Sequence, residues 1–259
     1  MILNETTLSN FEHQFKKIGN KIADWRSDEK LRKVLEPKEF KTVADKKAHV
    51  LIINLIHDLF GDIPILSEEE VIEDENRPEK YWLIDPIDGT ASWYDGFDGF
   101  VTQAAYIEYD IPLYGVVYAP VLAKLWSAIK NKGAFLNGIK LTNTIKSNRI
   151  NLIDNYPAPQ RIAKTIVEQL PVDNYIECGS LGLKSCMVAD GTADLFAKDV
   201  VIRDWDIAPV IVIMGELNGF ITDLQGNKIE LTKSFIKTNG LLVSRTAKLI
   251  SDVVNIRVK

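Results

Sequence analysis

The chain has 259 residues, of which 46% are apolar, and its 31 Lys and Arg against 36 Asp and Glu give a formal charge of −5. These values are typical of a globular protein and exclude the disordered, collagen-like and coiled-coil classes. The mild acidity also argues against nucleic acid as a partner, and it leaves the surplus carboxylates to be explained as solvated surface or as cation ligands.

The first 60 residues show the periodicity of two amphipathic helices. Apolar side chains recur at spacings of three and four from Leu8 to Trp25, and again from Ala48 to Leu59. Thr42 and Asp45 stand at the head of the second helix, where they are suitable capping residues. The acidic stretch 67–75 that follows predicts a strand end and an exposed loop.

From residue 81 the periodicity changes to two, which predicts strands of one largely antiparallel sheet. These strands are expected at 81–85, 100–108, 113–119 and 125–128. Beyond residue 140 strands alternate with helices, which predicts layered sheets covered by helices. The expected helices are 160–169, 183–189, 206–217 and 247–254, and the expected strands are 175–178, 194–197, 219–223 and 240–244. A boundary near residue 140 would divide the chain into halves 1–140 and 141–259.

The remaining sequence features favour a cytoplasmic protein that is not bound to a membrane. The longest apolar run, 208–214, is far shorter than the roughly 18 residues that a membrane helix requires. The first residues lack the basic and apolar regions of a signal peptide. The two cysteines, Cys178 and Cys186, have neither metal-binding nor redox spacing, which suits a reducing compartment.

The segment from Trp82 to Thr90 carries the strongest chemical signal. An apolar strand leads directly into Asp85 and Asp88, and Gly89 and Thr90 follow. At a strand end the two carboxylates can point toward one place, and a short helix starting near Thr90 would present free amides to a phosphate there. The EF-hand spacing is absent, and a plain turn remains an alternative. The acidic run 68–70, taken alone, is more typical of a solvated surface.

Four motifs, read together, resemble the inositol monophosphatase superfamily of magnesium-dependent, lithium-sensitive phosphatases. They are T-x-A-D at 42–45, S-E-E at 67–69, D-P-x-D-G-T at 85–90 and W-D-x-A at 205–208. The resemblance implies an α-β-α-β-α sandwich, with a mostly antiparallel N-terminal sheet, a mixed C-terminal sheet and the site between the two halves. It also implies a small phosphorylated substrate and a homodimeric assembly.

The resemblance assigns a role to each matching residue. It implies that two or three Mg²⁺ ions bind to Glu68, Asp85, the carbonyl of Ile87, Asp88 and Asp206. Catalytic roles near the attacking water fall on Asp45, Glu69 and Thr90, and Gly89 and Thr90 would contact the substrate phosphate. We hypothesise in-line attack of metal-activated water, since phosphoryl transfer depends mainly on positioning and charge neutralisation.

Two residues in and just after the W-D-x-A motif can be interpreted in more than one way. Asp206 could be a simple helix N-cap, and we expect the capping and metal-binding roles to coexist. Pro209 stands where the family often has Ala or Gly. We expect it in the first helical turn, where proline is tolerated.

The substrate is harder to assign than the reaction. Lys184, which follows Gly179 and Ser180, fits a second phosphate, although it could instead solvate a helix face. Asp199 lies seven residues before Asp206, where inositol monophosphatases have an acidic residue that binds inositol hydroxyls. We favour a 3′(2′),5′-bisphosphate nucleotidase that converts adenosine 3′,5′-bisphosphate into AMP and phosphate. An inositol-1-monophosphatase or broad sugar phosphatase is the alternative, and a non-catalytic metal-binding regulator is a third.

Overall fold

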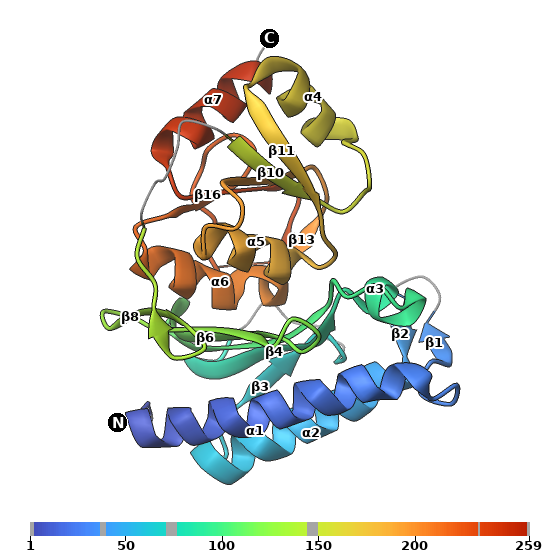
Figure 1. The fold of residues 1–259 in the computed structure, drawn as a ribbon. Coiled ribbons are helices and arrows are strands. Elements are labelled where there is room, and N and C mark those ends of the chain that lie inside the picture. The colour runs from blue at the N-terminus through green and yellow to red at the C-terminus, as the bar shows by residue number, and fades with distance from the viewer. Residues whose placement is uncertain (1–2, 37–39, 71–76, 144–149, 233, 258–259) are drawn as a thin grey trace.

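The computed structural model describes residues 3–36, 40–70, 77–143, 150–232 and 234–257, and it shows five stacked layers of helices and sheets (Figure 1). Two long helices cover a seven-stranded sheet, two further helices separate it from a five-stranded sheet, and two more helices cover the far side. This arrangement confirms the predicted α-β-α-β-α sandwich. The helices are α1 (Glu5–Asp24), η1 (Trp25–Ser27), α2 (Val43–Phe60), α3 (Thr90–Asp95), α4 (Arg161–Gln169), α5 (Leu181–Ala189), α6 (Asp204–Glu216) and α7 (Ala247–Arg257).

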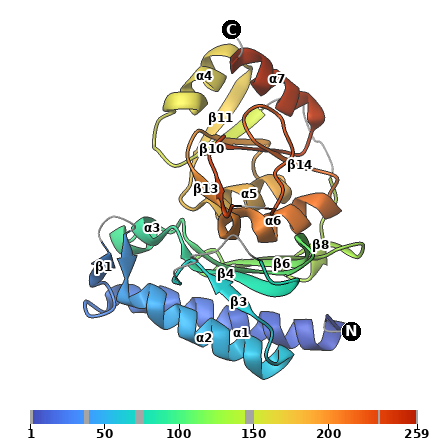
Figure 2. The same cartoon turned by 180° about the vertical axis from the view of Figure 1, so that it is seen from behind.

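The N-terminal sheet follows the order of the chain from β3 to β9. Only β3 and β4 pair in parallel, and all other neighbours are antiparallel, as predicted. Helices α1 and α2 lie side by side below this sheet, as the view from behind also shows (Figure 2). The strands are β3 (Ile65–Ser67), β4 (Lys80–Asp88), β5 (Val101–Glu108), β6 (Ile111–Ala119), β7 (Lys124–Ile129), β8 (Gly133–Leu136) and β9 (Ile139–Lys140).

The C-terminal sheet is mixed and has the strand order β11-β10-β12-β16-β14. Strands β11 and β12 both pair in parallel with β10, whereas β16 pairs antiparallel with β12 and β14. Its strands are β10 (Ile150–Asp154), β11 (Val172–Glu177), β12 (Leu195–Lys198), β14 (Phe220–Thr222) and β16 (Leu241–Ser244). Two small ribbons accompany the sheets, β1 (Val34–Glu36) with β2 (Lys41–Thr42) and β13 (Ile202–Arg203) with β15 (Ile236–Lys237).

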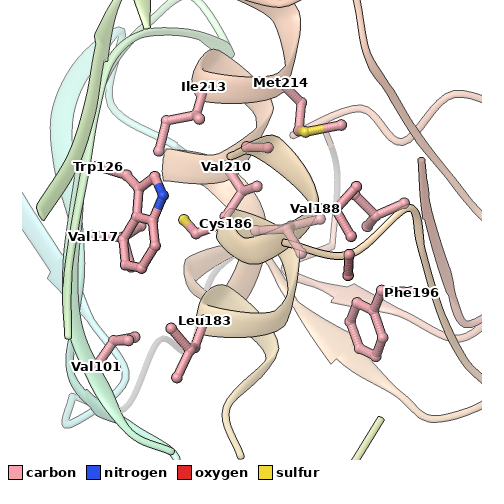
Figure 3. Close-up of a cluster of buried hydrophobic side chains, with 14 of the residues drawn as sticks. Val101, Val117, Trp126, Leu183, Cys186, Val188, Phe196, Val210, Ile213 and Met214 are labelled. Carbon is pink, nitrogen blue, oxygen red and sulfur yellow. The ribbon is translucent and has the colours of Figure 1, made fainter. Parts of the chain in front are cut away.

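A continuous apolar core joins the two sheets through α5 and α6 (Figure 3). Val117 and Trp126 of the N-terminal sheet face Cys186 of α5 and Val210 of α6, and Phe196 of β12 approaches from the other side. The change of sheet coincides with the predicted boundary at residue 140, but this core crosses it. The division into 1–140 and 141–259 therefore stays a prediction.

Some expectations differ from the structure. Strand β10 and the short strands β8 and β9 are missing from the sequence-based prediction. Helix α6 begins at Asp204, two residues earlier than expected, so Pro209 lies in the second turn and the expectation of a first-turn proline is wrong. Most of the predicted exposed loop, 71–76, lies outside the described residues. Within the described ranges no helix is long and apolar enough to cross a membrane.

Candidate active site

Three carboxylates from distant parts of the chain meet between the two sheets. Oxygen atoms of Asp85, Asp88 and Asp206 all lie within 4.8 Å of one another. Asp85 and Asp88 end β4, where the register with β5 shifts between the two residues and turns both side chains into the site. Asp206 comes from the first turn of α6. The structure thus brings together residues that the sequence motifs place about 120 positions apart.

The electrostatics of this cluster favour bound cations. Burial raises the pKa of Asp85 well above its usual value, and repulsion from Glu68, Asp88 and Asp206 raises it further. Burial also raises the pKa of Glu68 to about 7 and is the largest cause of the increase at Asp206. A buried set of oxygen donors that repel one another fits a hard divalent cation such as Mg²⁺.

Asp88 also holds the start of α5 against the N-terminal sheet. Its two carboxylate oxygens accept hydrogen bonds from the amides of Leu181 (3.3 Å) and Gly182 (2.6 Å). A carboxylate is favourable at a helix N-terminus because the first amides have no partner within the helix. A Cβ atom at Gly182 would lie 2.9 Å from Asp88 Oδ2, so this approach requires glycine.

Asp45 and Thr90 form a second hydrogen-bonded group beside the cluster. Asp45 Oδ2 accepts a hydrogen bond from the Thr42 amide (2.8 Å) within the predicted cap of α2. Asp45 Oδ1 lies 2.9 Å from Thr90 Oγ1, and that hydroxyl is also 3.0 Å from the Ile87 carbonyl. Gly89 precedes Thr90 with a φ of 90°, a conformation that favours glycine, and α3 starts at Thr90 as expected.

Asp206 belongs both to the N-terminal cap of α6 and to the acidic cluster. It is the third residue of the helix, and its Oδ2 accepts a hydrogen bond from the Arg203 amide (2.7 Å). Arg203 is the N-cap residue of α6. The alternative in which Asp206 itself is the N-cap is therefore wrong. The same carboxylate nevertheless reaches the acidic cluster, because the cap bond fixes its direction.

Glu68 and Glu69 lie in the turn after β3, next to a lysine that the sequence-based prediction missed. Lys41 is only 8% exposed, and its ammonium donates to the backbone carbonyl of Glu68. Burial raises the pKa of Glu69 to about 8, and Asp45 adds to the increase, whereas Lys41 lowers the pKa of both glutamates. The sequence offered one signal for Lys41, its position directly before Thr42 of the T-x-A-D motif.

Two of the four predicted substrate residues, Lys184 and Asp199, lie in the C-terminal half and already have protein partners. Lys184 is fully buried and donates to the Gly179 carbonyl, and burial lowers its pKa to about 8. The alternative that it solvates a helix face is therefore wrong. Asp199 follows β12, and its Oδ2 forms an ion pair with Arg161 Nε (2.9 Å). Their roles toward substrate stay predictions.

Comparison with known proteins decides the family. A sequence model described as the inositol monophosphatase family matches residues 3–257. The chain belongs to this family. Members of the family are metal-dependent phosphatases, so the chain is a phosphatase, and its acidic cluster could bind the metal.

Relatives with different substrates match at similar levels. A fructose-1,6-bisphosphatase/inositol-1-monophosphatase of Thermotoga maritima is 29% identical over 252 residues, which cover 92% of this chain and 93% of that protein. A 3′(2′),5′-bisphosphate nucleotidase CysQ of Shigella flexneri is 32% identical over 196 residues, which cover 74% of this chain and 79% of that protein. The crystal structure of inositol monophosphatase II from Staphylococcus aureus shares the fold, with a TM-score of 0.78 and 23% identity over 96% of this chain and 92% of that chain.

Proposed function

We propose that this chain is a magnesium-dependent phosphomonoesterase whose substrate is a nucleotide 3′,5′-bisphosphate. The observation that carries the reaction type is the buried cluster of Asp85, Asp88 and Asp206, whose carboxylates repel one another and fit hard cations. Together with Glu68 and the Ile87 carbonyl, they would hold two or three Mg²⁺ ions. When bound, these ions would neutralise the phosphoryl group, activate water and stabilise the leaving oxygen.

Asp45 and Thr90 would orient the attacking water. Thr42 fixes Asp45 Oδ2, which leaves Oδ1 to accept the hydroxyl hydrogen of Thr90. A hydroxyl donates one hydrogen and can still accept one, so Thr90 Oγ1 can accept a hydrogen from water while it donates to Asp45. Holding the water in place makes its attack on the phosphate effectively a unimolecular step. Positioning is a main contribution of the protein to phosphoryl transfer.

The charges beyond the cluster favour a substrate with a second phosphate. Burial raises the pKa of Asp88, and the buried Lys184 lies close enough to offset part of that increase. Lys198 at the end of β12 pairs with Asp154 (2.6 Å). Arg161 neutralises Asp199 and has a side chain that is 58% exposed. Three cationic side chains in this part of the C-terminal half, Arg161, Lys184 and Lys198, suit an anion better than a neutral polyol.

Inositol 1-phosphate or another sugar phosphate is the second candidate. Asp199 Oδ1 is buried and makes no hydrogen bond in the described part of the chain. A substrate hydroxyl could donate to this oxygen while Arg161 holds the other one.

A phosphate-release screen with Mg²⁺ tests the proposal. The substrates are adenosine 3′,5′-bisphosphate, inositol 1-phosphate, fructose 1,6-bisphosphate and histidinol phosphate. We expect the highest kcat/KM with adenosine 3′,5′-bisphosphate and loss of activity with a chelator. A tenfold or greater preference for inositol 1-phosphate would contradict the proposed substrate. No release from any of them would favour a metal-binding regulator.

Two further features of the proposal, lithium sensitivity and a homodimeric assembly, rest on the family resemblance. A third, a cytoplasmic location, rests on the two cysteines, whose spacing suits a reducing compartment.

A further inference from the structure

Pro209 removes one backbone donor from α6 close to the acidic cluster. In an α-helix, the N–H of residue 209 would bond to the carbonyl of residue 205, but proline has no N–H. The affected carbonyl belongs to Trp205, the residue directly before Asp206. A proline inside a helix destabilises it, in part through this lost bond.

The side chain of Gln103 supplies a donor to this carbonyl from another element. Gln103 is the third residue of β5, is fully buried, and places Nε2 3.0 Å from the Trp205 carbonyl oxygen. The same Nε2 lies 3.4 Å from Asp88 Oδ2. Both neighbours are acceptors, so the amide must turn its nitrogen toward them. One NH₂ group therefore faces both the Asp88 carboxylate and the start of α6.

Close packing leaves this amide little freedom. A Cβ atom at Gly182 would lie 2.3 Å from Gln103 Oε1, and a Cβ atom at Gly115 of β6 would lie 2.3 Å from the Pro209 carbonyl oxygen. Two glycines thus allow α5 to approach the glutamine and α6 to approach the sheet. A side chain locked by such contacts can hold its partners at fixed positions.

We propose that Gln103 is a positioning residue, which replaces the donor that Pro209 removes from α6 and keeps Asp206 in register with Asp88. The inference deepens the proposed function, since it rests on these two aspartates acting as metal ligands. Hydrogen-bond partners behind metal ligands affect metal affinity or activity by roughly 10- to 100-fold. Gln103 would serve ligands from both halves of the chain at once.

The test measures the Mg²⁺ dissociation constant by calorimetry, together with kcat and KM for phosphate release. Gln103→Leu keeps the size of the side chain but removes both donors. We expect it to weaken Mg²⁺ binding and lower kcat by about 10- to 100-fold with little change in KM. Gln103→Asn keeps an amide but is one methylene shorter, so it should give an intermediate loss.

A double-mutant cycle separates positioning from general stability. Pro209→Ala restores the N–H for the Trp205 carbonyl, so the loss caused by Gln103→Leu should shrink by at least about twofold in the Pro209→Ala background. Thr102→Val is the matched control, because Thr102 directly precedes Gln103 in β5, is 1% exposed and faces the opposite side of the sheet. We expect it to bind Mg²⁺ like the wild type.

Three results would overturn the inference: Gln103→Leu within twofold of the wild type, the same loss in Thr102→Val, or no recovery in the Pro209→Ala background. Circular dichroism shows which variants fold, and Gln103→Asn replaces Gln103→Leu in the cycle if the latter does not. Wild-type protein that binds Mg²⁺ but releases no phosphate would contradict the proposed function and would leave the metal-binding test of Gln103 valid.

Discussion

At the scale of single residues, the dominant feature of the site is repulsion among buried carboxylates. Asp85 is 1% exposed, and three acidic neighbours add to the effect of burial on its pKa. Lys41 and the α5 amides compensate part of this charge from the sides, at Glu68 and at Asp88 respectively. The remaining negative charge is what a divalent cation would neutralise.

The raised pKa of Glu68, which is caused mainly by burial, predicts that metal binding depends on pH. The pKa of Glu68 is raised to about 7, so metal-free protein keeps a proton there that a cation must displace. Mg²⁺ affinity should fall as the pH falls through about 7, by up to about tenfold per pH unit for each displaced proton. Calorimetry in buffers of different ionisation enthalpy would show proton release. A pH-independent affinity between pH 6 and 8 would contradict this assignment.

The same shift sets the sign of the effect on stability. Between the usual pKa of 4.5 and about 7, the folded metal-free protein binds more protons at Glu68 than the unfolded chain. This carboxylate therefore lowers the free energy of unfolding as the pH rises through that window. A bound cation offsets the destabilising effect of the ionised Glu68 carboxylate, so Mg²⁺ should increase the free energy of unfolding most above pH 7.

Residues with a motif around them could be predicted, and residues placed by packing could not. Asp85, Asp88 and Asp206 meet as expected because each belongs to a motif with a fixed local turn. Gln103 had only one weak signal, a polar residue within an apolar strand, and its partner on α6 is 102 positions away. Local spacing carries no information about such a contact.

At the scale of elements, the start of α6 is held by an ion pair as well as by the Gln103 amide. Arg77, just before β4, pairs with Asp204, the first residue of α6, and its guanidinium lies 3.7 Å from the ring centre of Phe235. Lys237 of β15 lies 3.3 Å from the other Asp204 oxygen. The Arg77–Asp204 pair links the N-terminal half to α6 at a position only two residues before Asp206.

Breaking this pair should destabilise the protein strongly. Both side chains are almost fully buried, at 4% and 0% exposure, so Arg77→Met leaves a buried charge without its main partner. We expect a loss of about 3–5 kcal/mol in the free energy of unfolding in urea, and a smaller loss in the double variant Arg77→Met/Asp204→Leu. The exposed pair Lys248–Asp252 is the control, and Lys248→Ala should cost about 0.3–0.5 kcal/mol. Equal losses at both pairs would refute this interpretation.

Elements with a long periodic pattern were predictable, whereas short elements fixed by distant contacts were not. The stripe from Leu8 to Ile22 is buried along α1, and Thr42 caps α2 as its sequence predicts. Helix α6 starts earlier than predicted because the Asp204 amide donates a hydrogen bond to the Phe235 carbonyl (2.9 Å). Phe235 directly precedes β15, which is distant in the sequence. Strand β10 is five residues long and is stabilised by its two parallel neighbours.

At the scale of the whole molecule, the layers explain how a chain of charge −5 can bind an anionic substrate. Glu70 is exposed to solvent, whereas Asp85, Asp88 and Asp206 converge between the sheets. Cations at this convergence would reverse the local charge without any change in the net surplus of acids. The core that joins both sheets through α5 and α6 holds the clustered carboxylates of the two halves together.

The most direct test of the account is Mg²⁺-dependent phosphate release by Asp85→Asn. Asparagine keeps the shape of the side chain and removes one charge from the cluster. Asp62→Asn, on the exposed turn after α2, is the matched control. The account predicts that Asp85→Asn loses turnover by at least about 100-fold and binds Mg²⁺ more weakly, while the control does neither. Near-wild-type turnover in Asp85→Asn would contradict it.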